Sequence, residues 1–247
     1  MNKQLNYYQK IWLEKIFEPY VSENANANAN ISYPFFTGVS DKYMSAKNRI
    51  MIVGQETRGW SVYKPDWPIV DSQKWAIDYL DYQLHYSNEF DFKLKFGKRN
   101  CSQFWNFFRA FSNSGIVPCW NNIDKAQRDI NGKTMSLTID MEMELNRNLP
   151  NTNKTLFQKE VEIIKPDVIV FITGPYYHAT MECALNIEKG SLQELNLSYA
   201  TGCLDITSVS RLGIPSFWTY HPRHITNSKN PLCRNDIINM IKSKLDI

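Results

Sequence analysis

The sequence predicts an α/β/α sandwich, in which a mainly parallel β-sheet lies between two layers of helices. Residues 50–53 and 168–172 are short, uninterrupted apolar runs rich in branched side chains, which is typical of strands buried on both faces. Residues 215–219 form a further strand-like segment. Segments with helical periodicity separate these strands, and strands that alternate with helices indicate an α/β fold with a parallel sheet.

The N-terminal part of the chain is expected to form a helical extension, covering about residues 1–30 of a single domain that spans 1–247. Large apolar side chains recur near one face at helical spacing over residues 5–21, namely Leu5, Tyr8, Trp12, Ile16 and Tyr20. Residues 24–30 alternate asparagine with alanine and offer nothing large and apolar to bury, so we expect a flexible loop there. An irregular apolar segment, 33–36, then leads to the first strand.

Further helices are expected between and after the strands. The first covers 73–90 with Ser72 as its N-cap, and the second covers 102–111, where aromatic side chains lie nearly all round. The others are expected at 138–148, at 156–164, after the strand 168–172 as far as residue 185, and from Pro231 or Asn235 onwards. Two segments are ambiguous, because 116–123 contains Pro118, which disfavours a strand, and 195–204 holds only short strand-like pieces.

Composition limits the class of protein. The chain has 247 residues, 43% of them apolar, which is enough for one large core. A formal net charge of +3 permits nucleic acid as a partner without requiring it. The five cysteines are scattered and include no C-x-x-C pair, so neither a zinc site nor an iron–sulfur cluster is indicated. No apolar run reaches membrane-spanning length and no signal-peptide core is present, so we expect a soluble, cytoplasmic protein that does not bind membranes.

Polar residues follow the predicted strands at three places along the chain. These loop residues are Gly54-Gln55-Glu56, Asn121-Asn122 and His221-Pro222-Arg223. In open α/β sheets, ligands bind in the crevice beyond the carboxyl ends of the strands. The sequence therefore predicts that the three loops share one site.

This set of loops resembles the motifs of the uracil-DNA glycosylase superfamily, which carries G-Q-D-P-Y after its first strand, an asparagine in mid-chain and a late H-P-S motif. Residues 163–177, where a proline–aspartate pair precedes a strand and a glycine ends it, are similar to the family's third-strand region. The resemblance covers residues 49–225. It implies a central sheet of four mainly parallel strands. It also implies a protein that flips uracil, or another damaged or deaminated base, out of DNA and hydrolyses its N-glycosidic bond, with no metal or organic cofactor.

The resemblance implies a chemical role for each loop. Breaking an N-glycosidic bond leaves positive charge on the sugar and negative charge on the departing base. Glu56 would activate the water and stabilise the sugar cation, and His221 would donate a hydrogen bond to the base oxygen. Asn122 would read the Watson–Crick edge of the flipped base, with Asn121 as the alternative if the register differs by one residue. Gln55 would add backbone contacts to the base.

Four residues in the second half of the chain are expected to contact DNA. By the resemblance, Ile225, four residues beyond His221, would wedge into the base stack. Arg223 and His224 would meet phosphates, and Gly174 would let a backbone amide approach one.

The first loop departs from the family pattern. Glu56 replaces the family's aspartate, while Thr57 and Arg58 replace its proline and tyrosine. In the uracil-specific branch that tyrosine excludes the methyl group of thymine. Arg58 or Trp60 would fill this space instead, so we expect both to contact the base and to decide which base is accepted.

Two other functions fit the same residues. A non-catalytic homologue would bind single-stranded or modified nucleic acid, and a small-molecule hydrolase would act on nucleosides or nucleotides. Taken singly, Glu56 is also consistent with a solvated loop residue or helix cap, His221 with a strand end, and Asn122 with a turn. The joint presence of Glu56 and His221 favours catalysis.

Overall fold

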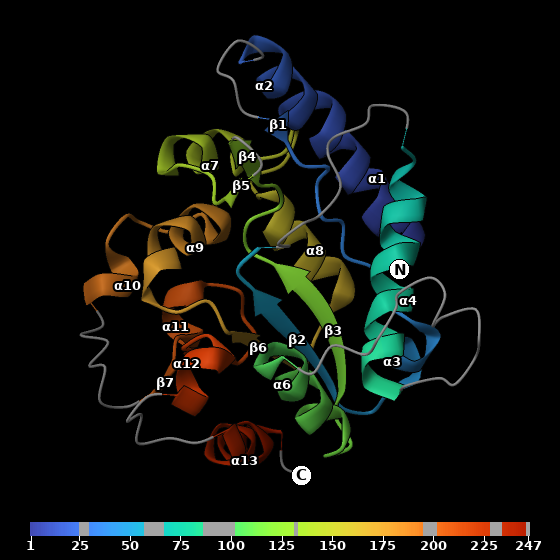
Figure 1. The fold of residues 1–247 in the computed structure, drawn as a ribbon, viewed down its shortest axis with the longest axis vertical. Coiled ribbons are helices and arrows are strands. Elements are labelled where there is room, and N and C mark those ends of the chain that lie inside the picture. The colour runs from blue at the N-terminus through green and yellow to red at the C-terminus, as the bar shows by residue number, and fades with distance from the viewer. Residues whose placement is uncertain are drawn as a thin grey trace.

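A mainly parallel sheet of five strands, in the order β3-β2-β6-β8-β7, forms the centre of the protein (Figure 1). The computed structural model describes residues 1–24, 30–56, 67–85, 102–130, 133–194, 202–227 and 234–245. The strands are β2 (Arg49–Gly54), β3 (Val117–Asn122), β6 (Val168–Phe171), β7 (Cys203–Asp205) and β8 (Ser216–Thr219). All neighbours pair in parallel except β7 and β8. The predicted α/β class with a mainly parallel sheet is confirmed.

The expected number of four strands is wrong, because β7 adds a fifth strand at one edge. β7 is three residues long and pairs antiparallel with β8, with Cys203 opposite Thr219. The side chain of Thr219 donates a hydrogen bond of 2.5 Å to the carbonyl of Gly202, just before β7. A strand this short is stabilised by its neighbour, and the sequence around it carries only a weak pattern of its own.

The segment that contains Pro118 is a strand despite the proline. It forms β3, which pairs only with β2 in the central sheet and so lies at its other edge, with Pro118 opposite Ile50. The N–H of the preceding residue, Val117, donates to the carbonyl of Asn48. Amides alternate in direction along a strand, so the proline nitrogen faces the edge, where no N–H is needed.

Helices cover both faces of the sheet. Successive strand residues point to opposite faces, and two neighbours in β3 identify the covering helices. Asn121 bonds to Glu160 of α8 (Leu156–Ile164), whereas Trp120 packs against Trp105 of α6 (Gln103–Ser112). The α8 face also carries α1 (Asn2–Trp12) and α9 (His178–Leu185), and the α6 face carries α12 (Pro222–Asn227) and α13 (Arg234–Lys244). The helix α4 (Ile69–His85) runs beside β3 and contacts both α1 and α6 (Figure 1).

Local signals set the ends of several helices. The α8 helix begins with a capping box of Thr155 and Gln158 and ends at Lys165, which has a left-handed φ of 50°. The α4 helix begins earlier than expected, because the carbonyl of Pro68 accepts hydrogen bonds from the N–H groups of Asp71 and Ser72. Ser72 is therefore inside the helix, and its expected role as N-cap is wrong. Residues 86–90 of that expected helix lie outside the described residues.

The N-terminal helical segment predicted over 5–21 is confirmed. It continues from α1 through a π-helical turn, η1 (Leu13–Phe17), into α2 (Glu18–Glu23). Residues 25–29 of the predicted loop lie outside the described residues. A small antiparallel sheet, which the sequence did not predict, joins β1 (Asn30–Ile31), β4 (Arg128–Ile130) and β5 (Lys133–Met135).

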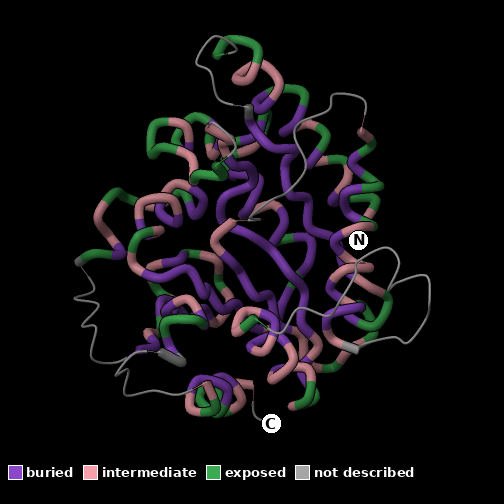
Figure 2. The backbone as a smooth tube through the Cα atoms, in the orientation of Figure 1, coloured by how far each residue is buried: buried purple, intermediate pink, exposed green. Residues whose placement is uncertain are grey.

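The remaining helices are short and connect the larger elements. They are α3 (Asp41–Ser45), α7 (Ile139–Leu145), η3 (Pro175–Tyr177), α10 (Ser191–Glu194) and α11 (Thr207–Ser210). The central strands are buried along most of their length, and exposed residues lie mainly on the outer sides of the helices (Figure 2). Within the described ranges, no helix combines the length and apolar character needed to cross a membrane.

Candidate active site

Backbone hydrogen bonds join the loops that follow β2 and β3 at the carboxyl edge of the sheet. The N–H of Ile123 donates to the carbonyl of Gly54, and the N–H of Asp124 donates to the carbonyl of Gln55, both at 3.0 Å. The two strands are already in register at their last residues, where Gly54 lies opposite Asn122. The loop with Glu56 and the segment with Asn122 are therefore held side by side.

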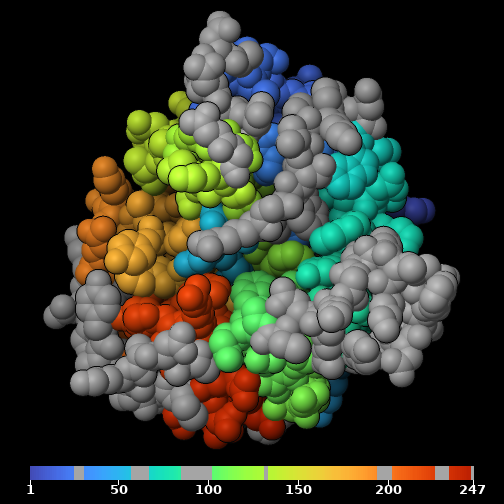
Figure 3. All heavy atoms as spheres, in the orientation of Figure 1, coloured from blue at the N-terminus to red at the C-terminus, as the bar shows by residue number. Residues whose placement is uncertain are grey.

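The loops after β6 and β8 reach the same edge. The side-chain amide of Gln55 donates a hydrogen bond of 2.5 Å to the carbonyl of Thr173, which follows β6. The next residue, Gly174, has a φ of +73°, and a Cβ placed on it would lie 3.8 Å from the backbone nitrogen of His221. In the space-filling view, light-blue atoms at the end of β2 reach the surface between α9 (orange), α12 (orange-red) and α6 (green) (Figure 3). The structure thus brings the predicted loops together.

Gly54 is required here for space. A Cβ on this residue would lie 2.7 Å from Oδ1 of Asn122 and 3.0 Å from the ring of Phe104. Cβ atoms rarely approach other atoms so closely, so only glycine allows the amide and the ring to lie against the end of β2.

Asn122 is fully buried at the end of β3. Its Oδ1 accepts a hydrogen bond of 2.9 Å from Nε1 of Trp120, two residues earlier on the same face. Its Nδ2 has no hydrogen-bond partner among the described residues.

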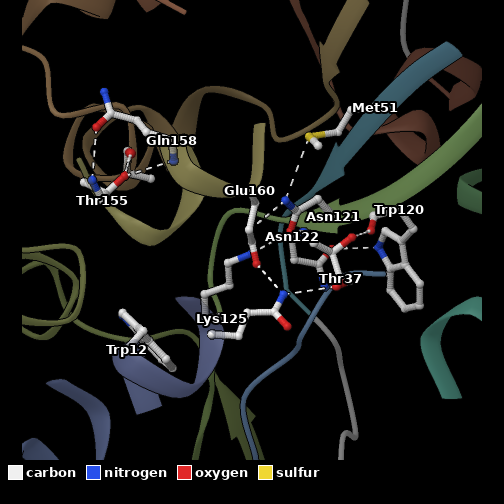
Figure 4. Close-up of polar contacts among 12 residues, drawn as sticks. Trp12, Thr37, Met51, Trp120, Asn121, Asn122, Lys125, Thr155, Gln158 and Glu160 are labelled. Atoms are coloured by element: carbon white, nitrogen blue, oxygen red, sulfur yellow. Dashed lines mark hydrogen bonds and ion pairs between the residues drawn. The ribbon is translucent and has the colours of Figure 1, made fainter. Parts of the chain in front are cut away.

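Asn121 points to the opposite face and belongs to a buried polar network beneath the site (Figure 4). Its Nδ2 donates to Glu160, while its Oδ1 accepts from the N–H of Asn122 and from Lys125. Lys125 and Glu160 form an ion pair of 2.6 Å in which both side chains are almost completely buried. Burial lowers the pKa of Lys125, and the Glu160 carboxylate opposes this shift. The network fixes the backbone of Asn122 and places Asn121 away from the site face.

Glu56 lies in a polar group with Ser136, which follows β5, and Tyr177 of η3. The hydroxyl of Ser136 donates to Oε2 of Glu56 at 2.7 Å and lies 3.0 Å from the hydroxyl of Tyr177. Burial raises the pKa of Tyr177, and the nearby carboxylates of Asp124 and Glu56 raise it further. Tyr177 is therefore protonated at neutral pH.

His221 begins the turn that leads into α12. Its Nδ1 accepts a hydrogen bond of 3.2 Å from the backbone N–H of Arg223. A neutral imidazole carries one proton, so this bond places that proton on Nε2. The ring stacks on Phe104, with 6.2 Å between ring centroids. Phe104 is thus close to both His221 and Gly54.

The residues expected to hold DNA are divided between surface and core. Arg223 and His224 are exposed on α12. Ile225, expected as a wedge, is only 7% exposed and packs in the main core, because it is on the inner side of α12. An exposed aromatic ring is available instead at Tyr176, which is 97% exposed beside Tyr177. The expected base contacts Arg58 and Trp60, together with Thr57, lie outside the described residues.

Asp124 and Glu142 form a buried carboxyl pair that sequence reasoning did not identify. Their exposed fractions are 1% and 2%. Burial raises the pKa of both groups, and the charge of the neighbouring Glu142 raises that of Asp124 further. The pair therefore retains a proton at neutral pH close to Glu56. Asp124 could be noticed as part of the polar run after Asn122, but only the fold shows that Glu142 of α7 meets it.

This pair predicts a pH-dependent stability. Folding raises the pKa of Glu142 from 4.5 to about 8, so the folded protein holds a proton that the unfolded chain releases. The stabilisation is fully present below the unfolded pKa and is lost as the pH rises through about 8. The free energy of unfolding should therefore fall between about pH 5 and pH 8, with a slope of up to about 1.4 kcal/mol per pH unit for one proton.

Urea unfolding across this pH range would measure the slope. Glu142→Gln combined with Asp124→Asn should flatten it, because neither amide titrates in this range. Glu144→Gln, at an exposed position of the same helix, should leave it unchanged. Equal slopes in the wild type and the double variant would contradict the prediction.

The fold and the site define a class: an α/β protein with a carboxylate, a carboxamide and an imidazole gathered at the carboxyl edge of a parallel sheet. Within the described residues, no group of three or more His, Cys, Asp or Glu side chains has the geometry to hold a metal ion. No protein-family model matches the chain, and neither a curated protein nor a solved structure matches it. Function is therefore inferred from this arrangement of residues.

Proposed function

We propose that the protein is a DNA glycosylase of the uracil-DNA glycosylase type, which flips a damaged or deaminated base from DNA and hydrolyses its N-glycosidic bond. The observation that carries the proposal is the convergence of Glu56, Asn122 and His221 on one edge of the sheet, from three loops far apart in the sequence. Each supplies a group that the reaction needs.

The carboxylate of Glu56 would stabilise the positive charge that develops on the sugar and orient the attacking water. Ser136 fixes one of its oxygens by a hydrogen bond of 2.7 Å, and Tyr177 supports Ser136. A carboxylate held in this way needs little reorganisation when charge develops beside it.

His221 would stabilise the departing base. Negative charge develops on a base oxygen as the bond breaks, and the Nε2–H group assigned by the Arg223 contact is a suitable donor to it. Asn122 would hold the base edge, while exposed Arg223 and His224 would contact phosphates. A net charge of +3 is compatible with a nucleic-acid substrate.

A small-molecule nucleoside hydrolase is the second candidate, and the burial of Ile225 favours it. A protein that opens a duplex commonly inserts an apolar side chain between bases, and Ile225 is packed in the core. A hydrolase acting on free nucleosides needs no such residue. Single-stranded DNA would also avoid this requirement, so strand preference is part of the test.

The test is a substrate panel with the purified protein. Single- and double-stranded oligonucleotides containing uracil, hypoxanthine, xanthine or hydroxymethyluracil would be incubated, treated with alkali and examined for strand cleavage. Free uridine, inosine and xanthosine would be assayed in parallel for base release. Cleavage of any oligonucleotide supports the proposal, and release from nucleosides alone supports the second candidate. No release, with DNA binding that weakens as salt rises, would indicate a non-catalytic binding protein.

A further inference from the structure

The orientation of the Asn122 carboxamide is fixed by Trp120. An indole Nε1–H can only donate a hydrogen bond, so the amide atom 2.9 Å from it is the oxygen and not the nitrogen. Trp120 and Asn122 are alternate residues of β3 and so lie on the same face of the sheet. The amide therefore turns its oxygen towards the indole and its NH₂ group away from it.

The indole is held in place by its surroundings. Trp120 is 7% exposed, and its ring packs against Phe35 and Trp105, with centroids 4.5 Å and 5.1 Å away. Its carbonyl accepts a hydrogen bond of 2.6 Å from Thr37. Because both the ring and the backbone of Trp120 are held in place, its Nε1–H group keeps the Asn122 amide in one orientation before any ligand binds.

The oxygen of Asn122 is also covered from the side of β2. It lies so close to Gly54 that a Cβ there would be 2.7 Å away. The backbone of Asn122 is held separately, because its N–H donates to Asn121 at 2.8 Å and Asn121 is bound by Lys125 and Glu160 (Figure 4). The side-chain oxygen of Asn122 is thus bound within the protein itself.

The side-chain nitrogen of Asn122 differs from the side-chain oxygen in its contacts. Nδ2 is buried and has no hydrogen-bond partner in the described part of the chain. A buried donor without a partner costs free energy, and a ligand that offers an acceptor recovers it. A ligand that places another donor at this point leaves Nδ2 without an acceptor and does not recover that free energy.

We propose that Trp120 is a positioning residue that makes Asn122 a donor-only contact, so that the site prefers bases with a carbonyl oxygen to bases with an exocyclic amino group at the position Asn122 meets. The inference rests on the proposed base-binding role of Asn122. A carboxamide free to rotate would accept either group, because it carries both a donor and an acceptor. The preference therefore depends on the indole as well as on the asparagine.

Binding of matched oligonucleotides tests the proposal. The probes are single strands that differ at one base, as uracil/cytosine and hypoxanthine/adenine pairs. The wild type should bind the carbonyl member more tightly by roughly 10–100-fold, the effect of one buried hydrogen bond made rather than left unmade. Trp120→Phe keeps an aromatic ring but removes the donor, and it should bring this ratio towards one.

The matched control is Trp105→Phe. Trp105 packs on Trp120 and is 5% exposed, so it tests the effect of losing a buried indole nearby. It should keep the wild-type ratio. Gly54→Ala is a second variant, which displaces the amide oxygen from the other side with the indole intact, and it should also lower the ratio. A ratio unchanged in both Trp120→Phe and Gly54→Ala would overturn the proposal.

A measurement without ligand separates this inference from the proposed function. In ¹⁵N relaxation measurements, the side-chain NH₂ group of Asn122 should be rigid in the wild type. In Trp120→Phe it should be more mobile, and in Trp105→Phe it should not. Equal mobility in wild type and Trp120→Phe would overturn the positioning role. If the wild type binds no oligonucleotide, the proposed function and the ligand class both fail, while the mobility of the amide still decides the role of Trp120.

Discussion

Replacing Glu56 with glutamine is expected to slow base release by roughly 10²–10⁴-fold, the range typical for loss of a general base. Glutamine has the same shape and can still accept the hydrogen bond from Ser136, so the variant removes charge and basicity with little change in packing. The loss should appear in the rate of the chemical step and not in DNA affinity, because in the proposed reaction the carboxylate acts on charge that is absent from the bound substrate.

The measurement is the single-turnover rate of base release from the best oligonucleotide of the panel, together with its dissociation constant. Glu162→Gln is the control, because Glu162 pairs with lysines on the exposed side of α8. Its rate should equal that of the wild type. A rate in Glu56→Gln within a few-fold of the wild type would remove Glu56 from the reaction.

Replacing Lys125 with methionine is expected to lower the free energy of unfolding by about 3–5 kcal/mol. The change leaves the carboxylate of Glu160 buried without its cation, and removal of one partner of a buried ion pair costs more than the pair itself contributes. Oδ1 of Asn121 also loses one of its two donors and keeps the N–H of Asn122. Adding Glu160→Gln to Lys125→Met should recover part of the loss, because an amide carries no charge into the core.

Lys154→Met provides a matched comparison, because its partner Glu162 lies on the same helix as Glu160. Lys154 and Glu162 are 2.7 Å apart, almost the same distance as Lys125 and Glu160, but their side chains are 47% and 46% exposed. Surface pairs contribute about 0–1 kcal/mol, so this variant should change stability little. Urea unfolding at one pH would compare the two. Equal effects would show that burial does not determine the cost.

The parts of the fold that were predictable are those whose signal is local. The apolar runs at β2 and β6 and the helical spacing of apolar residues in α8 identify their elements without knowledge of any partner. The strands β7 and β1 are two or three residues long, and their pairing partners determine them. The effect of Pro118 also depends on the partners of its strand, since a proline that argues against a strand is harmless at a sheet edge.

In the site, too, the predictable features are local in sequence and the others depend on distant residues. The loops after β2, β3 and β8 could be placed together because parallel strands bring their carboxyl ends to one edge. The contacts that define the chemistry of each side chain are distant in sequence: Ser136 lies 80 residues from Glu56. Ile225 illustrates the difficulty for apolar residues, because spacing from His221 cannot distinguish an exposed wedge from the buried face of a helix.

The first helix has a consequence for how the chain can be divided. Gln9 of α1 is fully buried and donates to Oε1 of Glu160 at 2.9 Å, across 151 positions of sequence. It also accepts a hydrogen bond from Gln73 of α4. A shorter chain starting at the first strand would keep every motif residue but lose one end of the polar chain that supports Asn121. We therefore expect the smallest autonomous folding unit to include α1, so that it is larger than the segment that carries the motifs.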